Sequence, residues 1–315
     1  SMKGNLLINL GSPKQLSIES VKDYLTEFLS DDLVIDFPKP IQKFLVKGII
    51  VPLRHKKTFE SYKKIWTDEG SPLIVISKKL GQRVQDETGI KTEVGMRYKE
   101  PSIKDALNNL INQGCEEIRV LPLYPQFTGS SSLTSINKVK ELKKEQNSKS
   151  INYIYKESFY NDQNYIKYLT ESISRKLPDN VDYLLFSFHG LPNRQDTQFE
   201  PSYSSQCKET SRLVAEKLGF SEKQWGVSFQ SRLGPGWTKP FTDKVLSNLP
   251  NEGKKNLAVV SPAFYVDNLE TLEELSIEGE KTFLDSGGEE FAYIDCLNDS
   301  DFGVKVIASL LEEMN

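Results

Sequence analysis

The sequence predicts an α/β fold in which helices cover both faces of parallel sheets, and it predicts that this arrangement occurs twice. Short apolar runs alternate with longer segments of helical spacing, which is typical of parallel sheets in α/β proteins. The order of strand, helix, strand and helix recurs in the second half of the chain, which favours a duplicated domain. The alternative is that the halves look alike only because all α/β units share this pattern.

The expected strands are short and almost continuously apolar, as strands buried on both faces of a sheet are. They comprise residues 6–10, 118–123, 183–188, 225–229 and 257–260. Helices are expected between them. One starts at Ser17, a residue type that caps helix N-termini, and another starts at Pro101, which suits a first helical turn, and stops at Gly114.

The chain has 315 residues, enough for two domains of roughly 100–200 residues each. We expect an N-terminal domain over residues 3–150 and a C-terminal domain over residues 151–301. A last helix, residues 302–314, is expected to be free to pack back on the N-terminal domain. Residues that follow strands are the first functional candidates, because loops at the carboxyl ends of parallel strands line the ligand crevice.

Composition excludes several classes of protein. Lys and Arg number 40 against 44 Asp and Glu, so a strongly basic nucleic-acid binder is excluded. The chain has two histidines and three widely separated cysteines, Cys115, Cys207 and Cys296, so a closed four-ligand zinc site is not expected. Sparse, unpaired cysteines indicate a reducing compartment, and no apolar run approaches the roughly 18 residues of a membrane span. We therefore expect a cytoplasmic protein.

His189 follows the apolar run 183–188 and precedes Gly190 and Pro192, so it lies where a predicted strand ends in a turn. An imidazole titrates near neutral pH and suits proton abstraction or ligation of a borderline metal. A purely structural histidine in a turn is the alternative, and the sequence leaves both open. The other histidine, His55, lies in a basic run and is not expected to be a ligand.

A line of carboxylates follows the predicted strand 257–260. Glu270, Glu274 and Glu278 are spaced four residues apart, so on a helix they share one side, with Asp267 at its entrance. Such a stripe is usually a solvated acidic face. Because this one begins where a strand ends, a path that carries cations in or protons out is the second interpretation.

Residues 37–54 combine many apolar side chains with four cations, Lys39, Lys43, Lys47 and Arg54, and they contain no Asp or Glu. Such a segment suits a membrane surface or the lip of a pocket for a large apolar anion. An ordinary buried helix with its lysines outside is an equal alternative.

Several motifs occur in a fixed order along nearly the whole chain. They are the runs at residues 6–13, 94–98, 124–126, 187–192 and 230–232, Trp237, the run 261–264 and the run 267–272. Together they resemble the ferrochelatase family, enzymes that insert ferrous iron into a porphyrin at the end of haem biosynthesis. The resemblance implies two similar Rossmann-like domains with the porphyrin in a cleft between them.

The resemblance also implies His189 and Glu270 as the facing residues that handle metal and protons. Insertion removes two pyrrole protons while a divalent ion is delivered, and one imidazole with one carboxylate gives ligation weak enough to release the ion. We expect Glu274 and Glu278, with Asp267, to form the proton or ion path. Weaker candidates for porphyrin contact are Ser12, Arg97, Tyr98, Gln126 and Trp237. For Trp237, an ordinary core aromatic is an equal alternative.

Ferrous iron is then a substrate, and no permanently bound cofactor is expected. Some family members carry a four-cysteine iron–sulfur cluster, but three separated cysteines cannot supply four ligands, so we expect none here. The His-Gly-Leu-Pro form and the Gln-Ser-Arg run are more similar to the protoporphyrin IX branch than to the coproporphyrin III branch.

The alternatives are a coproporphyrin III ferrochelatase, another tetrapyrrole chelatase, or a two-lobed protein that binds haem or a metal chelate without chemistry. Peripheral contact with the inner face of the cell membrane through residues 37–54 stays open. The sequence does not fix the oligomeric state.

Overall fold

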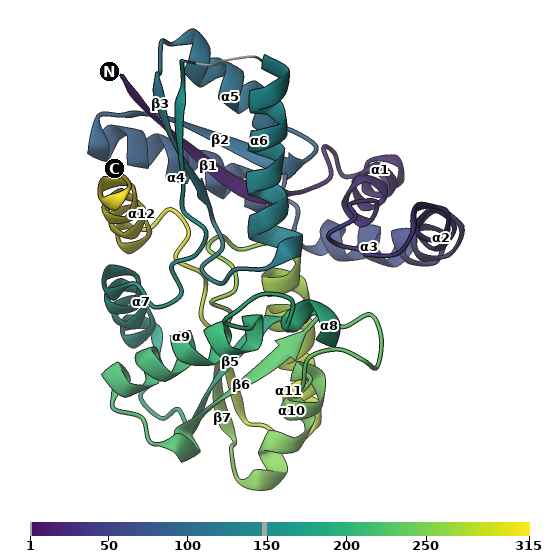
Figure 1. Cartoon of the computed structure of the whole chain (residues 1–315). Helices are drawn as coiled ribbons and strands as arrows, with labels where there is room; N and C mark the ends of the chain where they lie inside the picture. The colour runs from purple at the N-terminus through teal and green to yellow at the C-terminus, as the bar shows by residue number, and fades with distance from the viewer. Residues whose placement is uncertain (1, 147–149) are drawn as a thin grey trace. The chain divides into compact units, whose positions relative to one another are not determined.

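The structure is a computed structural model that describes residues 2–146 and 150–315 (Figure 1). The chain divides into two compact units. Unit 1 comprises Ser1–Leu123, Gly129–Glu157 and Ile307–Asn315, and unit 2 comprises Tyr124–Thr128 and Ser158–Val306. In this division Tyr124–Thr128 belongs to unit 2 and Ile307–Asn315 belongs to unit 1. The domain boundaries at residues 150 and 301 stay predictions.

Each unit contains one four-stranded sheet whose neighbouring strands are all parallel. In unit 1 the spatial order is β2 (Lys91–Tyr98), β1 (Lys3–Gly11), β3 (Glu117–Pro122) and β4 (Asn152–Tyr155). In unit 2 it is β6 (Trp225–Gln230), β5 (Tyr183–His189), β7 (Asn256–Val260) and β8 (Glu290–Tyr293). The two orders are equivalent, which confirms the predicted α/β fold of two similar halves.

The helices of unit 1 cover both faces of its sheet. They are α1 (Ile18–Leu29), α2 (Lys39–Leu45), η1 (Val46–Ile50), α3 (Val51–Ile65), α4 (Pro72–Thr88), α5 (Ile103–Asn112), η2 (Gly129–Leu133) and α6 (Thr134–Gln146). The apolar faces of α5 and α6, with Leu107, Leu110 and Val139, pack on Ile8 and Val120 of the sheet. Burial of this face, rather than helix propensity alone, stabilises the layer.

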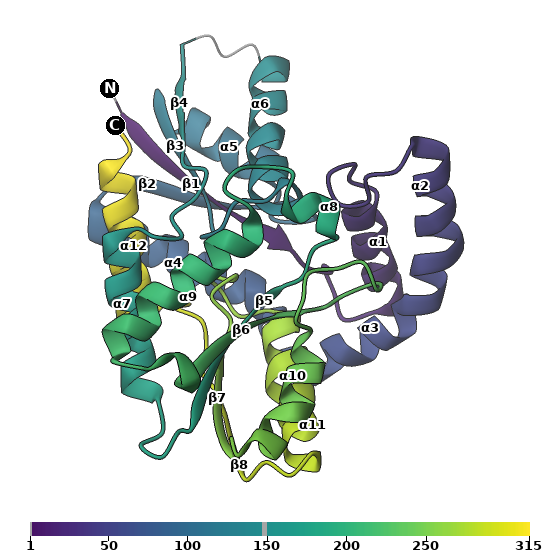
Figure 2. The ribbon, with the colours of Figure 1, turned by 60° about the horizontal axis from the view of Figure 1, so that its bottom comes forward.

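Unit 2 follows the same plan. Its helices are α7 (Gln163–Lys176), α8 (Asn193–Asp196), α9 (Tyr203–Leu218), η3 (Glu222–Gln224), α10 (Thr242–Asn248), η4 (Leu249–Glu252), η5 (Glu270–Glu278), α11 (Gly279–Asp285) and the first half of α12 (Asp301–Glu313). Leu246 of α10, Leu275 of η5 and Phe283 of α11 are buried on Leu185 and Val259 of the sheet. Figure 2 shows α10 and α11 side by side on this face.

The duplication extends to helix irregularities. In unit 1 the π-helix η2 follows β3, and in unit 2 the π-helix η5 follows β7, the strand in the equivalent place. π-Helical turns are rare and occur frequently at functional sites. The residues differ in kind, because η2 contains serines whereas η5 contains glutamates.

Two predicted helix starts have different outcomes. Ser17 caps α1 as expected, since its side chain accepts a hydrogen bond from the Ser20 N–H at 3.1 Å. The start at Pro101 is wrong by two residues, because Ser102 is the cap and accepts from the Asp105 N–H at 3.0 Å. A serine hydroxyl accepts a hydrogen bond from a free N–H of the first turn, and a proline side chain cannot. The helix therefore begins after Ser102.

The C-terminal residues are held in unit 1 by a buried arginine. Arg119 of β3 is 2% exposed and donates from Nε to the Met314 carbonyl at 2.7 Å and from its guanidinium to the Asn315 side chain at 3.2 Å. Within the described residues, no helix is long and apolar enough to cross a membrane.

Candidate active site

His189 is the last residue of β5, one of the two internal strands in the sheet of unit 2. Its ring is half-buried, and Nδ1 lies 2.7 Å from the Gly190 carbonyl oxygen. A carbonyl can only accept, so Nδ1 carries the proton in this contact and the neutral ring keeps its lone pair on Nε2. That nitrogen is therefore free to take a proton or to bind a metal.

The chain around His189 is fixed by backbone contacts. Tyr203 donates its hydroxyl to the His189 carbonyl at 2.8 Å, and the Gly190 N–H donates to the Gln230 carbonyl at 2.7 Å. A Cβ at position 190 would come within 2.9 Å of that same carbonyl oxygen and 3.4 Å of the Trp237 ring. Glycine is required here by this close approach, and Trp237 packs on the His189 turn.

The carboxylates lie on η5, which is a π-helix rather than the α-helix that their spacing predicts. Asn268 starts it, because its side-chain oxygen accepts from the N–H groups of Glu270 at 2.9 Å and Thr271 at 3.3 Å. Hydrogen bonds from i to i+5 place more residues in each turn than an α-helix does. A four-residue step then falls short of a full turn, so the three glutamates follow one side of the helix with a steady drift.

Asp267 is 3% exposed, and its two oxygens accept four hydrogen bonds. The donors are the Thr271 hydroxyl at 2.8 Å, the Tyr293 hydroxyl at 2.7 Å, the Cys296 N–H at 3.2 Å and the Asn298 side chain at 2.8 Å. These contacts tie the start of η5 to the chain after β8. A role for Asp267 in an ion path stays a prediction.

Glu274 is bonded to the residue that follows β6. It is partly buried and accepts from the Ser231 N–H at 2.9 Å and from the Ser231 hydroxyl. Burial raises its pKa above the ordinary glutamate value, and the negative charge of Glu270 raises it further. The Ser231 hydrogen bonds and the His189 imidazole act in the opposite direction. Within unit 2, Glu270 and His189 therefore both influence the protonation of Glu274.

The three glutamates differ in exposure. Glu278 is exposed, whereas Glu270 and Glu274 are partly buried, so the line runs from solvent into the protein. A fully solvated acidic face does not describe this arrangement.

The raised pKa of Glu274 has a consequence for stability. The native state holds this proton more tightly than the unfolded chain, so the free energy of unfolding falls as pH rises from the ordinary carboxyl range through the native pKa of Glu274. Glutamine carries no such proton. We expect wild type to lose stability relative to Glu274→Gln over the pH range that starts at the ordinary glutamate pKa and ends at the raised native pKa of Glu274. Urea denaturation of both proteins across this range measures the difference, and parallel curves would contradict it.

Two predicted porphyrin contacts of unit 1 are joined through an acid that the sequence did not single out. Asp31 accepts from the Arg97 guanidinium at 3.2 Å, from the Tyr98 hydroxyl at 2.6 Å and from the Thr134 hydroxyl. The Arg97 guanidinium also lies 4.8 Å from the centre of the Tyr98 ring. Only three-dimensional contact identifies Asp31, which belongs to no motif.

The remaining candidates lie elsewhere. Ser12 of unit 1 is buried and donates to the Ser71 hydroxyl at 2.7 Å. Gln126 of unit 2 is buried and donates to the Thr210 hydroxyl at 3.2 Å and more weakly to the Pro262 carbonyl at 3.4 Å. In these contacts both side chains bond to protein groups, and porphyrin contact by either stays a prediction.

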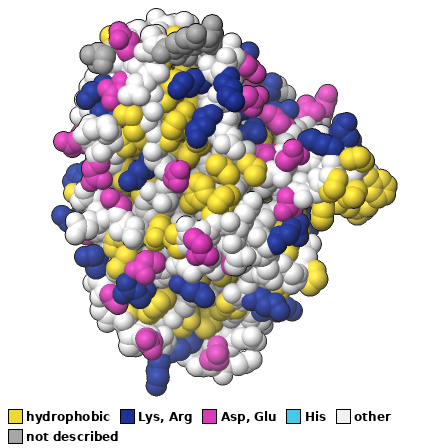
Figure 3. Space-filling model, viewed as in Figure 1, with side chains coloured by type: hydrophobic (Ala, Val, Ile, Leu, Met, Phe, Trp, Pro, Cys, Tyr) yellow, Lys and Arg dark blue, Asp and Glu magenta, His cyan; other side chains and the backbone are white. Residues whose placement is uncertain are grey.

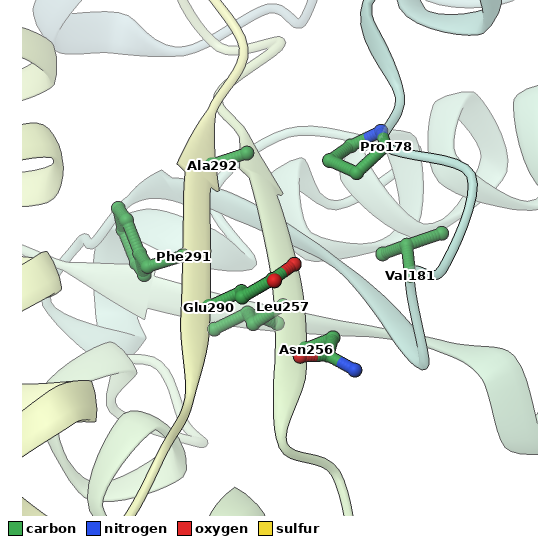
Figure 4. Close-up of a pocket in the computed structure, with 7 residues that line it drawn as sticks. All are labelled: Pro178, Val181, Asn256, Leu257, Glu290, Phe291 and Ala292. Carbon is green, nitrogen blue, oxygen red and sulfur yellow. The ribbon is translucent and has the colours of Figure 1, made fainter.

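A cavity of about 290 Å³ lies in unit 2, away from His189. Figure 4 shows its lining, which is Pro178, Val181, Asn256, Leu257, Glu290, Phe291 and Ala292. Asn256 and Glu290 begin β7 and β8, so the cavity is at the amino ends of the strands, whereas His189 ends β5. Because the strands are parallel, the cavity lies at the amino ends of the strands and the candidate site lies at their carboxyl ends.

Among residues 2–146 and 150–315, no group of three or more histidine, cysteine or acidic side chains could hold a metal ion. The candidate site instead offers one imidazole and the η5 carboxylates.

Comparison with known proteins identifies the family. The ferrochelatase family model matches residues 2–315. The ferrochelatase of Actinobacillus pleuropneumoniae serotype 5b is 40% identical over 98% of this chain and 97% of its own length, and that of Vibrio vulnificus is 39% identical over 99% and 98%.

Solved structures show the same fold. SirB from Bacillus subtilis with Fe3+ has a TM-score of 0.59 at 12% identity over 99% of this chain and 95% of its own. The match of the family model and the full-length relatives agree with the two parallel sheets and with the order of the motifs along the chain. This chain therefore belongs to the ferrochelatase family of metal chelatases.

Proposed function

We propose that this ferrochelatase inserts ferrous iron into protoporphyrin IX, with His189 and Glu270 as the groups that handle the metal and the pyrrole protons. The observation that carries the proposal is the pairing of a free Nε2 lone pair on His189 with an electrostatically linked line of carboxylates on η5. Both belong to unit 2, where His189 ends β5 and η5 is the helix that follows β7.

The reaction exchanges two pyrrole protons for one divalent ion. His189 Nε2 accepts a proton, because its other nitrogen is occupied by the Gly190 carbonyl. Glu270 is its acidic partner, and one imidazole with one carboxylate binds ferrous iron weakly enough to pass it on. Glu274, whose pKa is raised by burial, is suited to exchange protons nearer neutral pH, and the exposed Glu278 connects it to solvent.

Porphyrin contact is assigned to Ser12, Arg97, Tyr98, Gln126 and Trp237 as part of the same proposal. Trp237 has the strongest support, since its ring packs on the turn that carries His189.

The choice of porphyrin is tested by anaerobic ferrous insertion into protoporphyrin IX and coproporphyrin III in parallel. We expect a higher kcat/KM with protoporphyrin IX. A preference for coproporphyrin III would assign the chain to the alternative substrate, and activity with neither would favour a chelatase for another tetrapyrrole or a binding protein.

We also propose peripheral membrane contact through residues 37–54, at the inner face of the cell membrane. The apolar side chains Phe44 and Leu53 are 66% and 77% exposed, and Phe37, Ile41 and Ile49 are also exposed. Figure 3 shows apolar side chains gathered over α2 and the start of α3, with cations beside them. An ordinary buried helix is therefore not what this segment forms, although Val46 and Val51 do face inward.

Exposed apolar residues among lysines suit an anionic lipid surface, since the side chains enter the interface while the cations meet lipid headgroups. The variant Phe44→Ser with Leu53→Ser is expected to lose at least tenfold in binding to vesicles of phosphatidylcholine and phosphatidylserine. Leu284→Ser, which removes an exposed leucine on α11, is the matched control. Cosedimentation measures both, and equal binding by all three proteins would contradict the proposal.

A further inference from the structure

Ser231 has an uncommon backbone conformation. It follows Gln230, the residue of β6 that pairs with His189, and its φ is +63°. Left-handed backbone is unusual for residues other than glycine and is retained where the surrounding structure requires it.

The conformation directs two donors of one residue to one carboxylate. The Ser231 N–H donates to one oxygen of Glu274 at 2.9 Å, and the Ser231 hydroxyl donates to the other oxygen. Both oxygens of Glu274 are thereby held, and the side chain has little freedom to turn. Hydrogen bonds to a charged carboxylate are stronger than those between neutral groups.

The segment that begins at Ser231 returns to the turn after His189. Thr238 donates its N–H to the Leu191 carbonyl at 2.9 Å and accepts from the Leu191 N–H at 3.2 Å, and the Asn193 N–H donates to the Gly236 carbonyl at 3.0 Å. Residues 231–238 thus bond to Glu274 at one end and to the His189 turn at the other.

We propose that Ser231 is a positioning residue for iron insertion, which holds the Glu274 carboxylate in a fixed place relative to His189. The inference rests on the proposed function, in which Glu274 passes on protons. The charged groups that influence Glu274 are Glu270 on its own helix, His189 on β5 and Arg232, which is paired with Asp243.

The test uses a variant that removes the serine side chain with its hydroxyl, tolerates the left-handed backbone and keeps the N–H. Ser231→Gly adopts φ of +63° without strain and keeps the N–H bond, whereas Ser231→Ala loses the hydroxyl and keeps the strain. Ser247→Ala is the control, because the Ser247 hydroxyl donates to the backbone carbonyl of Asp243 rather than to a carboxylate. We expect Ser231→Gly to lower kcat about tenfold with an unchanged KM for porphyrin and an unchanged melting temperature.

The pH profile and a double variant separate positioning from a structural role. Loss of a donor to the carboxylate raises the Glu274 pKa, so the acid limb of the kcat profile moves to higher pH. In a Glu274→Gln background, Ser231→Gly is expected to have no further effect on kcat. The proposal would be overturned if Ser231→Gly lowered kcat by the same factor with and without Glu274→Gln. It would also be overturned if Ser231→Gly had the kcat and the pH profile of wild type.

One readout does not require activity. Carbon-13 NMR of the Glu274 carboxyl, assigned with Glu274→Gln, should show a higher pKa in Ser231→Gly than in wild type. If wild type inserts no iron, the proposed function is refuted but the role of Ser231 can still be tested by this titration. If the Glu274 pKa is the same in Ser231→Gly as in wild type, the role of Ser231 is refuted.

Discussion

Replacing His189 with alanine should lower the rate of ferrous insertion roughly 100- to 10,000-fold, the range that a positioned general base contributes. The variant loses the Nε2 lone pair that the Gly190 contact leaves free. Porphyrin affinity and the melting temperature should change little, because the His189 ring is only half-buried and the contacts of Tyr203 and Gly190 in this turn are to backbone.

The control is His55→Ala. His55 also directs Nδ1 to a backbone carbonyl, that of Val51 at 2.8 Å, but it lies in α3 of unit 1 within a basic run. Its loss should leave insertion unchanged. Anaerobic stopped-flow absorbance follows metallation in both variants, and near-wild-type turnover by His189→Ala would remove His189 from the mechanism.

The second large effect is expected for Glu270→Gln, which keeps the size of the side chain and removes its charge. Turnover should fall at least 100-fold while the dissociation constant for porphyrin changes less than threefold, since the carboxylate acts on protons and metal rather than on the bound ring. Loss of its charge should also lower the pKa of Glu274, because the Glu270 charge raises it.

Glu278→Gln is the matched comparison, at the exposed end of the same line. Its effect on turnover should be below tenfold. Porphyrin fluorescence titration gives the affinity, and an anaerobic assay gives the turnover. A defect of Glu270→Gln in affinity alone would indicate a packing role.

The fold was predictable because its main signal is local. Five of the strands are mostly apolar runs, four of them almost wholly buried, and the sequence predicts all five with small errors at their ends. The edge strands β2, β4 and β8 are not among these runs. The strands β4 and β8 have four residues each, which is too short a pattern to distinguish from a loop. Their pairing with β3 and β7 defines them.

The helix type at η5 could not be predicted from the spacing of its glutamates. A four-residue repeat is typical of an α-helix, and nothing in the side chains signals hydrogen bonds from i to i+5. The distinction changes the geometry of the line, because a four-residue step overshoots a full turn in an α-helix and falls short of one in a π-helix. Glu270, Glu274 and Glu278 therefore drift around the helix axis in the opposite direction.

The site residues also fall into those that the sequence predicts and those that only contacts in the structure identify. His189 was predictable because it follows a strand run directly, whereas Ser231 and Asp31 were not. Ser231 contacts Glu274 from 43 residues away, and Asp31 contacts Tyr98 from 67 residues away. Contacts of this kind depend on the packing of separate elements and leave no periodic trace in the sequence.

The most direct measurement is the amount of haem formed per protein molecule in an anaerobic reaction with excess ferrous iron and protoporphyrin IX. The account predicts many turnovers by wild type, with the rate lost in His189→Ala while porphyrin binding remains. Binding of one porphyrin per protein molecule, with haem forming no faster than in the absence of protein, would contradict it and would describe a binding protein.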